Sequence, residues 1–275
     1  MKTILSLTDF SPVADTAVEV GFMIAEQQGA TLLIMHAMPL DNSIQLNLSD
    51  TAESDDSPSK DREGIYEMLQ EWKSRATKSG LNLRIILSNG DLVKSITNST
   101  EAADAELVIM GTTGLGQSDG IWGTTTKQVV KQLPLPVLVV KDKPSNALFD
   151  NIVFASDLDP EDQIALTTSI ELLKPASTAK IHLVSVNTSS FSTQPRALMT
   201  ALLDDFSKLV MPYESNTTFY SDYSVAAGIR HFVEHTKPDL LIMSSRKRNP
   251  IKDLFIPDPA MAAVGELPCP VLIIK

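Results

Sequence analysis

Residues 105–141 read AELVIMGTTGLGQSDGIWGTTTKQVVKQLPLPVLVVK, and this stretch decides the fold. Two apolar runs, Glu106–Met110 and Pro136–Val140, are each long enough for one buried strand. Between them lie a glycine-rich loop, Gly111–Gly123, and a helical segment, Thr124–Leu133. A strand, a glycine loop and a helix start in this order are typical of a phosphate site, because glycines permit close backbone approach and free N–H groups at a helix start attract anions. The plainer interpretation is that the glycines only turn a long loop.

Strand-like and helix-like segments also alternate in the residues before this stretch. Ser11 suits a helix N-cap and Pro12 the first helical position. Residues 38–60 are polar and are expected to form an exposed loop. Such alternation predicts an α/β fold with a doubly wound parallel sheet of five strands. The expected strands are Thr3–Leu7, Thr31–Ala37, Leu81–Leu87, Glu106–Met110 and Pro136–Val140, and the helices between them are Pro12–Gln28, Asp61–Lys78, Asp91–Ala103 and Thr124–Leu133.

The pattern then restarts, after a linker at Lys141–Leu148. Asn151–Pro160 repeats the first strand and its turn, with Asp157 at the place of Asp9. Matching segments in the same order indicate an internal duplication and two domains, residues 1–146 and 147–275. The other matched pairs are Ala179–Val186 with Ala30–Ala37, Asp239–Met243 with Glu106–Met110, and Glu266–Lys275 with Gln132–Lys141.

The length, charge and cysteine content of the chain exclude several classes of protein. A chain of 275 residues fits two domains of ordinary size. The net charge is −11, of which residues 1–143 carry −7 and residues 144–275 carry −4, so neither half has the basic excess of a nucleic-acid binder. Nothing approaches the roughly 20-residue apolar span of a membrane helix. The start lacks the pattern of a signal peptide, and a single cysteine fits a reducing compartment, so a cytoplasmic location is expected.

Three groups of residues together resemble the universal stress protein family. They are Thr8–Ser11 after the first strand, Met35–Ala37 at the end of the second, and Gly111-x2-Gly114…Gly123-Thr124 before Pro136–Val140. The resemblance covers nearly the whole chain, twice. It implies two tandem sheets with strand order 3-2-1-4-5, of the HUP or Rossmann-like kind. The last strands of the two sheets would pair antiparallel, so that the chain forms an internal pseudo-dimer; a homodimer of whole chains is compatible with this.

The resemblance also implies an adenine nucleotide, ATP, held across the carboxyl ends of the first and fourth strands of the first domain. Asp9 would face the ribose and adenine, the backbone near Ala37 would meet the adenine edge, and the residues from Gly111 onward would surround the phosphates. Eight residues separate Gly114 from Gly123 where the family motif has nine, so either the loop is tightened or phosphate contacts are partly lost. The implied binding residues are Asp9, Ala37, Met110, Gly111, Gly114, Gly123, Thr124 and Thr125.

The second half has lost this motif. Aligning Met243 with Met110 puts Ser244 and Lys247 at the first two glycine positions, and Pro257 and Asp258 follow at the family's length. Asp258 would cap the next helix and repel a phosphate there, so nucleotide is expected only in the first domain. The basic run 246–248 is either a solvated turn or a docking site for an acidic partner or a phosphate.

No catalytic or metal set stands out. His182, His231 and His235 lack acidic or cysteine partners at metal spacing, so no metal is expected. His36 is expected to be packed or partly exposed, and Cys269 to be a small apolar filler and not a nucleophile.

Three functions fit these observations. The leading one is a nucleotide-binding stress-response regulator that is not an enzyme. The second is a slow ATPase or an adenylating enzyme, although the Gly-x4-Gly-Lys-Ser/Thr and Ser-Gly-Gly-x-Asp phosphate loops are both absent from the sequence. The third is a ligand-free interaction module in which both sites are degenerate. Which protein partner or pathway is served cannot be read from the sequence.

Overall fold

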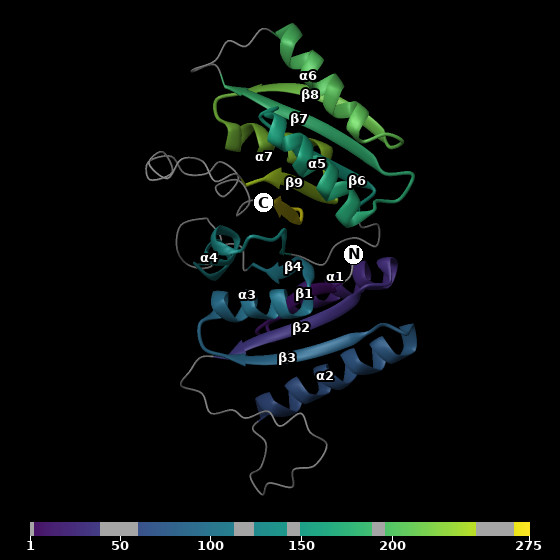
Figure 1. Cartoon of the computed structure of the whole chain (residues 1–275). Helices are drawn as coiled ribbons and strands as arrows, with labels where there is room; N and C mark the ends of the chain where they lie inside the picture. Colours follow the sequence, from purple (N-terminus) through teal and green to yellow (C-terminus); the bar gives the residue numbers. More distant parts are fainter. Residues whose placement is uncertain (1–2, 39–59, 113–123, 142–148, 189–195, 246–266) are drawn as a thin grey trace, which may run out of the picture.

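The structure is a computed structural model, and it describes residues 3–38, 60–112, 124–141, 149–188, 196–245 and 267–275. Strands and helices alternate through the first half and, in the second half, as far as β9, as Figure 1 shows. The first half contains β1 (Thr3–Thr8), α1 (Pro12–Gln28), β2 (Thr31–Met38), α2 (Lys60–Ser79), β3 (Leu83–Asn89), α3 (Leu92–Ala103), β4 (Ala105–Gly111), α4 (Thr124–Gln132) and β5 (Val137–Val140). The second contains β6 (Asn151–Ala155), α5 (Pro160–Leu173), β7 (Lys180–Thr188), α6 (Arg196–Leu209), β8 (Glu214–Asp222), α7 (Val225–Thr236), β9 (Leu240–Ser244) and β10 (Val271–Ile274).

The ten strands found among the described residues belong to one sheet, in the order β3-β2-β1-β4-β5-β10-β9-β6-β7-β8. In the part of the chain that the structure describes, the pairings within each half are parallel, and one antiparallel pairing joins β5 to β10 at the middle of the sheet. The predicted α/β fold, its duplication and the antiparallel contact between the halves are therefore confirmed. The predicted domain boundary at residues 146 and 147 lies outside the described residues and stays a prediction.

The central strands are apolar on both faces because helices cover both. All four residues of β5 and all four of β10 are buried. On one face, α1, α2, α5 and α6 pack over a core that includes Phe22, Trp72 and Phe206. On the other face, α3, α4 and α7 pack over a second core that includes Val129 and Phe232. Each core runs through both halves, so the two repeats are joined by packing as well as by strand pairing.

Both predicted ends of β3 are two residues too early, because the strand is Leu83–Asn89 and not Leu81–Leu87. Leu81 instead closes the end of α2: its N–H donates to the Ala76 carbonyl at 2.9 Å, and Gly80 takes the left-handed conformation with φ of +69°. This is the usual glycine-dependent helix end, in which an apolar residue follows the glycine and packs back on the helix.

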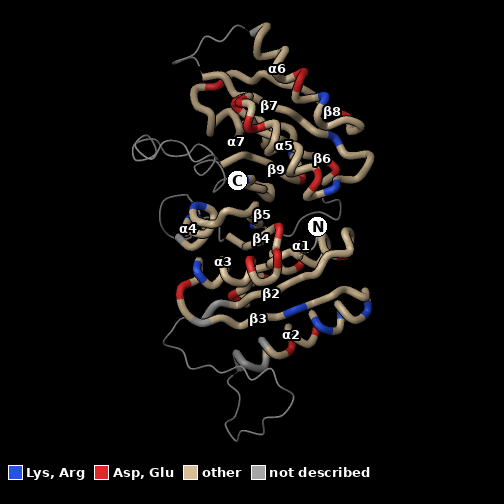
Figure 2. The backbone as a smooth tube through the Cα atoms, in the orientation of Figure 1, with Lys and Arg blue, Asp and Glu red and all other residues tan. Residues whose placement is uncertain are grey.

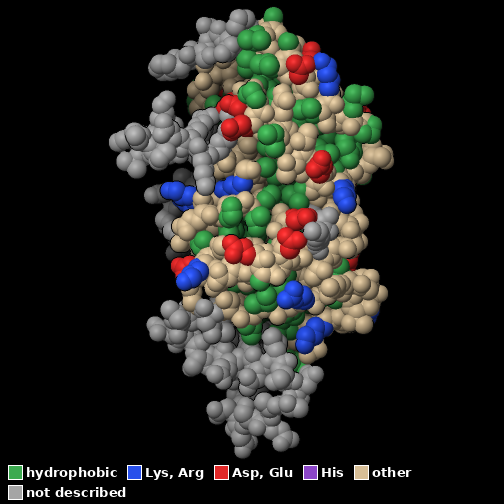
Figure 3. Space-filling view, in the orientation of Figure 1, with side chains coloured by type: hydrophobic (Ala, Val, Ile, Leu, Met, Phe, Trp, Pro, Cys, Tyr) green, Lys and Arg blue, Asp and Glu red, His purple; other side chains and the backbone are tan. Residues whose placement is uncertain are grey.

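Charged side chains of both signs are interspersed along the chain, as Figures 2 and 3 show. One group has a clear structural role, because Arg75 of α2 bonds both carboxylate oxygens of Glu19 at 2.9 and 2.8 Å and also reaches Glu26. The same guanidinium lies 4.3 Å from the centre of the Phe22 ring. These contacts tie α2 to α1. No helix in the described ranges has the length and apolarity that crossing a bilayer requires.

Candidate functional site

The turn between β1 and α1 is built from side-chain hydrogen bonds to the backbone. The Thr8 hydroxyl accepts from the N–H of Phe10 at 3.0 Å, and Asp9 Oδ1 accepts from the N–H of Ser11 at 3.0 Å. Ser11 is the N-cap of α1, as predicted, and its Oγ accepts from the N–H of Ala14. Phe10 takes a positive φ of 61° to make this turn. Asp9 is thereby held at the carboxyl end of β1 while its side chain stays exposed.

A cluster of three aromatic rings, Phe10, His36 and Trp72, lies beside this turn. The sequence did not predict this cluster. His36, near the end of β2, lies 2.8 Å through Nδ1 from the Thr8 carbonyl oxygen; because a carbonyl only accepts, Nδ1 carries the proton. The Phe10 ring packs on His36 with centroids 4.7 Å apart and stacks on Trp72 of α2 at 6.0 Å. Ala37 follows on β2, in register with Ser88 of β3. The end of β2, which was predicted to contact the adenine, therefore lies next to the packed rings of Phe10 and His36.

The end of β4 lies next to the end of β1. Met110 is buried, and Gly111 is the last residue of the strand. A Cβ on Gly111 would lie 2.7 Å from the carbonyl oxygen of Val13, so this glycine lets α1 approach β4 closely. That packing role was not foreseen from the loop motif. Thr112 follows, buried, with its N–H donating to the Val140 carbonyl at 2.9 Å and with no described partner for its hydroxyl.

The remaining predicted residues belong to the loop and to α4. Gly114 and Gly123 lie outside the described residues, so their part in a site stays a prediction. Thr124 is the first residue of α4, and Thr125 is exposed in its first turn. The structure thus brings Asp9, Ala37, Met110 and Gly111 to the ends of three neighbouring strands, β2, β1 and β4.

The second half repeats the strand-to-helix turn almost bond for bond. The Ser156 hydroxyl accepts from the N–H of Leu158 at 2.8 Å, as Thr8 does from Phe10. Asp157 Oδ1 accepts from the N–H of Asp159 at 3.2 Å, and Leu158 takes a φ of 64°. Asp159 is the N-cap of α5, at the place of Ser11. The duplication therefore extends to the hydrogen bonds of the candidate site.

The two halves differ at the residue that packs beneath the strand ends. Asp162 stands where the first half has Ala14, and only 1% of its surface is exposed. Its two carboxylate oxygens each accept a 2.5 Å hydrogen bond, from Ser156 after β6 and from Ser244 at the end of β9. Ser244 takes the place of Gly111. A carboxylate thus bridges the two strand ends in the second half, where the first half has only a methyl group and a glycine.

Asp162→Ala is expected to lower the free energy of unfolding by about 1–3 kcal/mol, because it leaves the Ser156 and Ser244 hydroxyls without their acceptors. Chemical denaturation of the full chain measures this. Glu171→Ala removes an exposed acid from the same helix and should change the stability by no more than about 0.5 kcal/mol. If both variants unfold at the wild-type midpoint, Asp162 does not hold the strand ends together.

His231 has an acidic partner that does not lie at the sequence spacing of a metal site. Its Nδ1 lies 2.8 Å from Oδ2 of Asp222, nine residues earlier, at the end of β8. This hydrogen bond lowers the pKa of Asp222. Burial lowers the pKa of His182, which lies on β7 against Phe232. No group of three or more histidine, cysteine or acidic residues in the described ranges is placed to hold a metal ion.

Cys269 is buried, and burial raises the pKa of its thiol to about 12. At neutral pH it stays protonated, which makes it a poor nucleophile. This agrees with its interpretation as an apolar filler ahead of β10.

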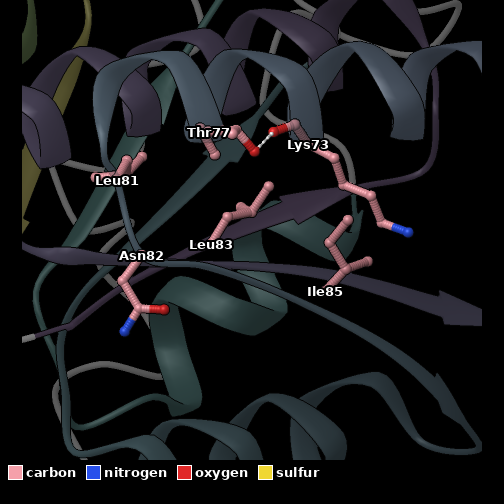
Figure 4. Close-up of a pocket in the computed structure, with 7 residues that line it drawn as sticks. Lys73, Thr77, Leu81, Asn82, Leu83 and Ile85 are labelled. Atoms are coloured by element: carbon pink, nitrogen blue, oxygen red, sulfur yellow. Dashed lines mark hydrogen bonds between the residues drawn. The ribbon is translucent and has the colours of Figure 1, made fainter.

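A cavity of about 560 Å³ lies between the end of α2 and the start of β3 (Figure 4). Leu83 and Ile85 rise from β3 toward the helix, and the Thr77 hydroxyl donates to the Lys73 carbonyl on the opposite side. Because β3 begins at Leu83, this cavity is at the amino edge of the sheet. The candidate site is at the carboxyl edge, so the cavity is separate from it.

Comparison with known proteins gives the same result in both halves. A sequence model of the universal stress protein family matches residues 1–141 and 148–275. No protein of curated function matches the sequence. A solved universal stress protein from Archaeoglobus fulgidus DSM 4304 aligns with a TM-score of 0.72 and 16% identity, over 99% of this chain and 98% of that one. A putative universal stress protein from Pseudomonas aeruginosa UCBPP-PA14 aligns with a TM-score of 0.67 and 15% identity, over 100% and 93%. A universal stress protein solved in complex with cAMP matches 46% of this chain and 98% of its own, at 15% identity and a TM-score of 0.38.

Proposed function

Because this chain belongs to the universal stress protein family, we propose that it is a stress-response protein that binds ATP or a related adenine nucleotide in its first half only. Its role is regulatory: nucleotide occupancy, not turnover, is the signal. The difference between the two strand-end sites carries the proposal. The turns are the same, but Ala14 and Gly111 leave the first site uncharged beneath the strand ends, whereas Asp162 places a carboxylate there in the second.

The difference between the two halves affects binding because the nucleotide is negatively charged. The chain has a net charge of −11, so a nucleotide phosphate is not attracted by the protein as a whole and needs local donors. In the first half, α4 begins at Thr124 after the glycine-rich stretch, and a helix start presents N–H groups and the positive end of the helix dipole to an anion. In the second half, the Asp162 carboxylate lies at the matching edge and opposes an anion.

The aromatic cluster of Phe10, His36 and Trp72 favours a position for the adenine base next to the first site. Phe10 and His36 lie at the ends of β1 and β2, on the side away from β4. A nucleotide that crosses the strand ends with its phosphates near α4 would bring its base toward β2. Asp9 is exposed and lies between the proposed positions of the phosphates and the base, where the ribose is expected.

The test is a calorimetric titration of the full chain with ATP, together with mass spectrometry of any nucleotide released when freshly purified protein is denatured. We expect saturable heat with ATP and no accumulation of ADP or AMP over the titration. An absence of heat at millimolar ATP, with no nucleotide released from the purified protein, would favour a ligand-free interaction module. ADP or AMP release that depends on Asp9 would instead show an enzyme.

A further inference from the structure

The histidines of α7 form a pair that the nucleotide proposal does not use. His231 and His235 are four residues apart on one helix, so their side chains leave the same face. Residues at this spacing are neighbours, with about 5–6 Å between their Cβ atoms. The His231 side chain is 40% exposed, and His235 is exposed as well. Both imidazoles are therefore accessible from solvent on the same side of the helix.

Asp222 fixes the orientation and the tautomer of one of the two rings. Its Oδ2 accepts from Nδ1 of His231 at 2.8 Å, and its Oδ1 accepts from the N–H of Tyr223 at 2.7 Å. With Nδ1 protonated, Nε2 of the neutral His231 ring has a free lone pair on the side away from the carboxylate. A carboxylate behind a histidine in this way is the usual outer support of a metal-ligating histidine.

The helix cap at Ser224 and the close approach at Gly228 hold His231 next to Asp222. Ser224 caps α7 by accepting from the N–H of Ala227 at 3.1 Å. A Cβ on Gly228 would lie 2.5 Å from Cγ1 of Val186 and 3.2 Å from Cβ of Asp222, so this glycine lets α7 come close to the ends of β7 and β8. The close approach places His231 within hydrogen-bond reach of Asp222.

We propose that His231 and His235 form a site for a divalent transition-metal ion of the kind that imidazole prefers, such as Cu²⁺ or Zn²⁺. Two imidazole nitrogens at this helical spacing are a recurring half of protein metal sites. No third histidine, cysteine or acidic residue of the described ranges completes a metal-holding group with this pair. Cu²⁺ should bind more tightly than Zn²⁺, as the general order of divalent metals at nitrogen sites requires. The site lies in the second half and does not depend on the proposed nucleotide site.

The test uses the full chain, stripped of metal by a chelator and titrated with CuCl₂ in a calorimeter. His235→Ala removes an exposed side chain, so its fold should be intact, and it should weaken binding at least tenfold. Asp222→Asn should weaken binding about 10–100-fold, the cost typical of a lost outer partner. His182→Ala, which removes a histidine from β7, is the matched control and should bind as the wild type does.

Electron paramagnetic resonance of the copper-loaded wild type should show two coordinated nitrogens, and His235→Ala should show one. The proposal is overturned if the wild type binds no copper at 100-fold excess over protein. It is equally overturned if His235→Ala and His182→Ala bind copper alike, because the Asp222–His231 pair would then only fasten α7 to β8. If Asp222→Asn binds as tightly as wild type, the supporting role of Asp222 is wrong.

Discussion

Replacing Val139 and Ile273 together with lysine is expected to unfold the chain or to lower its melting temperature sharply. Val139 is 2% exposed and Ile273 is fully buried, in the two strands that join the halves. Val139 pairs with Val271, and Ile273 pairs with Val137, so both lysines would enter the same apolar layer at the centre of the sheet. A buried ammonium group without a partner costs several kcal/mol, which for two approaches the roughly 5–15 kcal/mol that stabilises a typical domain.

Thermal melting followed by circular dichroism measures this effect. Ile164→Lys makes a matched chemical change on α5, where the side chain is 68% exposed, and should leave the melting temperature nearly unchanged. A double variant that melts like wild type would mean that β5 and β10 do not pair within the chain.

Gly114→Asp is expected to weaken ATP binding by at least about a hundredfold, or about 2.7 kcal/mol, while the melting temperature without nucleotide stays that of wild type. This prediction rests on the proposed function. The new residue would add a side chain and a negative charge where the family resemblance places the phosphates. Calorimetry with ATP measures the affinity.

Gly64→Asp is the matched control for this variant. Gly64 is exposed in α2, and a Cβ there would meet no atom within 4 Å, so the same charge is added without a clash and outside the glycine-rich loop. It should bind ATP as wild type does. Equal affinity in Gly114→Asp would mean that the nucleotide site lies elsewhere and that the eight-residue loop spacing has misplaced the motif.

The first half could be predicted from sequence because its strands are strongly apolar and its helix ends carry clear cap residues. Ser11 and Asp91 cap α1 and α3 as their residue types indicate. The edge strand β8 was not placed, because its residues alternate weakly and none of them is buried. An edge strand has a neighbouring strand on one side only, so more of it is open to solvent and its apolar pattern is weaker.

The candidate site was less predictable because its distinguishing contacts join distant residues. Asp162 lies three residues after a helix N-cap, where an acidic residue is ordinary. Its hydrogen bond to Ser244 spans 82 residues and follows only from the pairing of β6 with β9. Asp222 and His231 are nine residues apart but meet because a tight turn folds α7 back on β8. Residue spacing at metal sites gives no sign of such a contact.

The number of ATP molecules bound per chain tests the central claim most directly. Equilibrium dialysis of the full chain against labelled ATP gives this number without assuming which half binds. The two halves share their turns, but only the second carries the Asp162 bridge between its strand ends. The predicted result is one nucleotide per chain in wild type and none in Gly114→Asp; two equivalent nucleotides per chain, or one that persists in Gly114→Asp, would contradict the account.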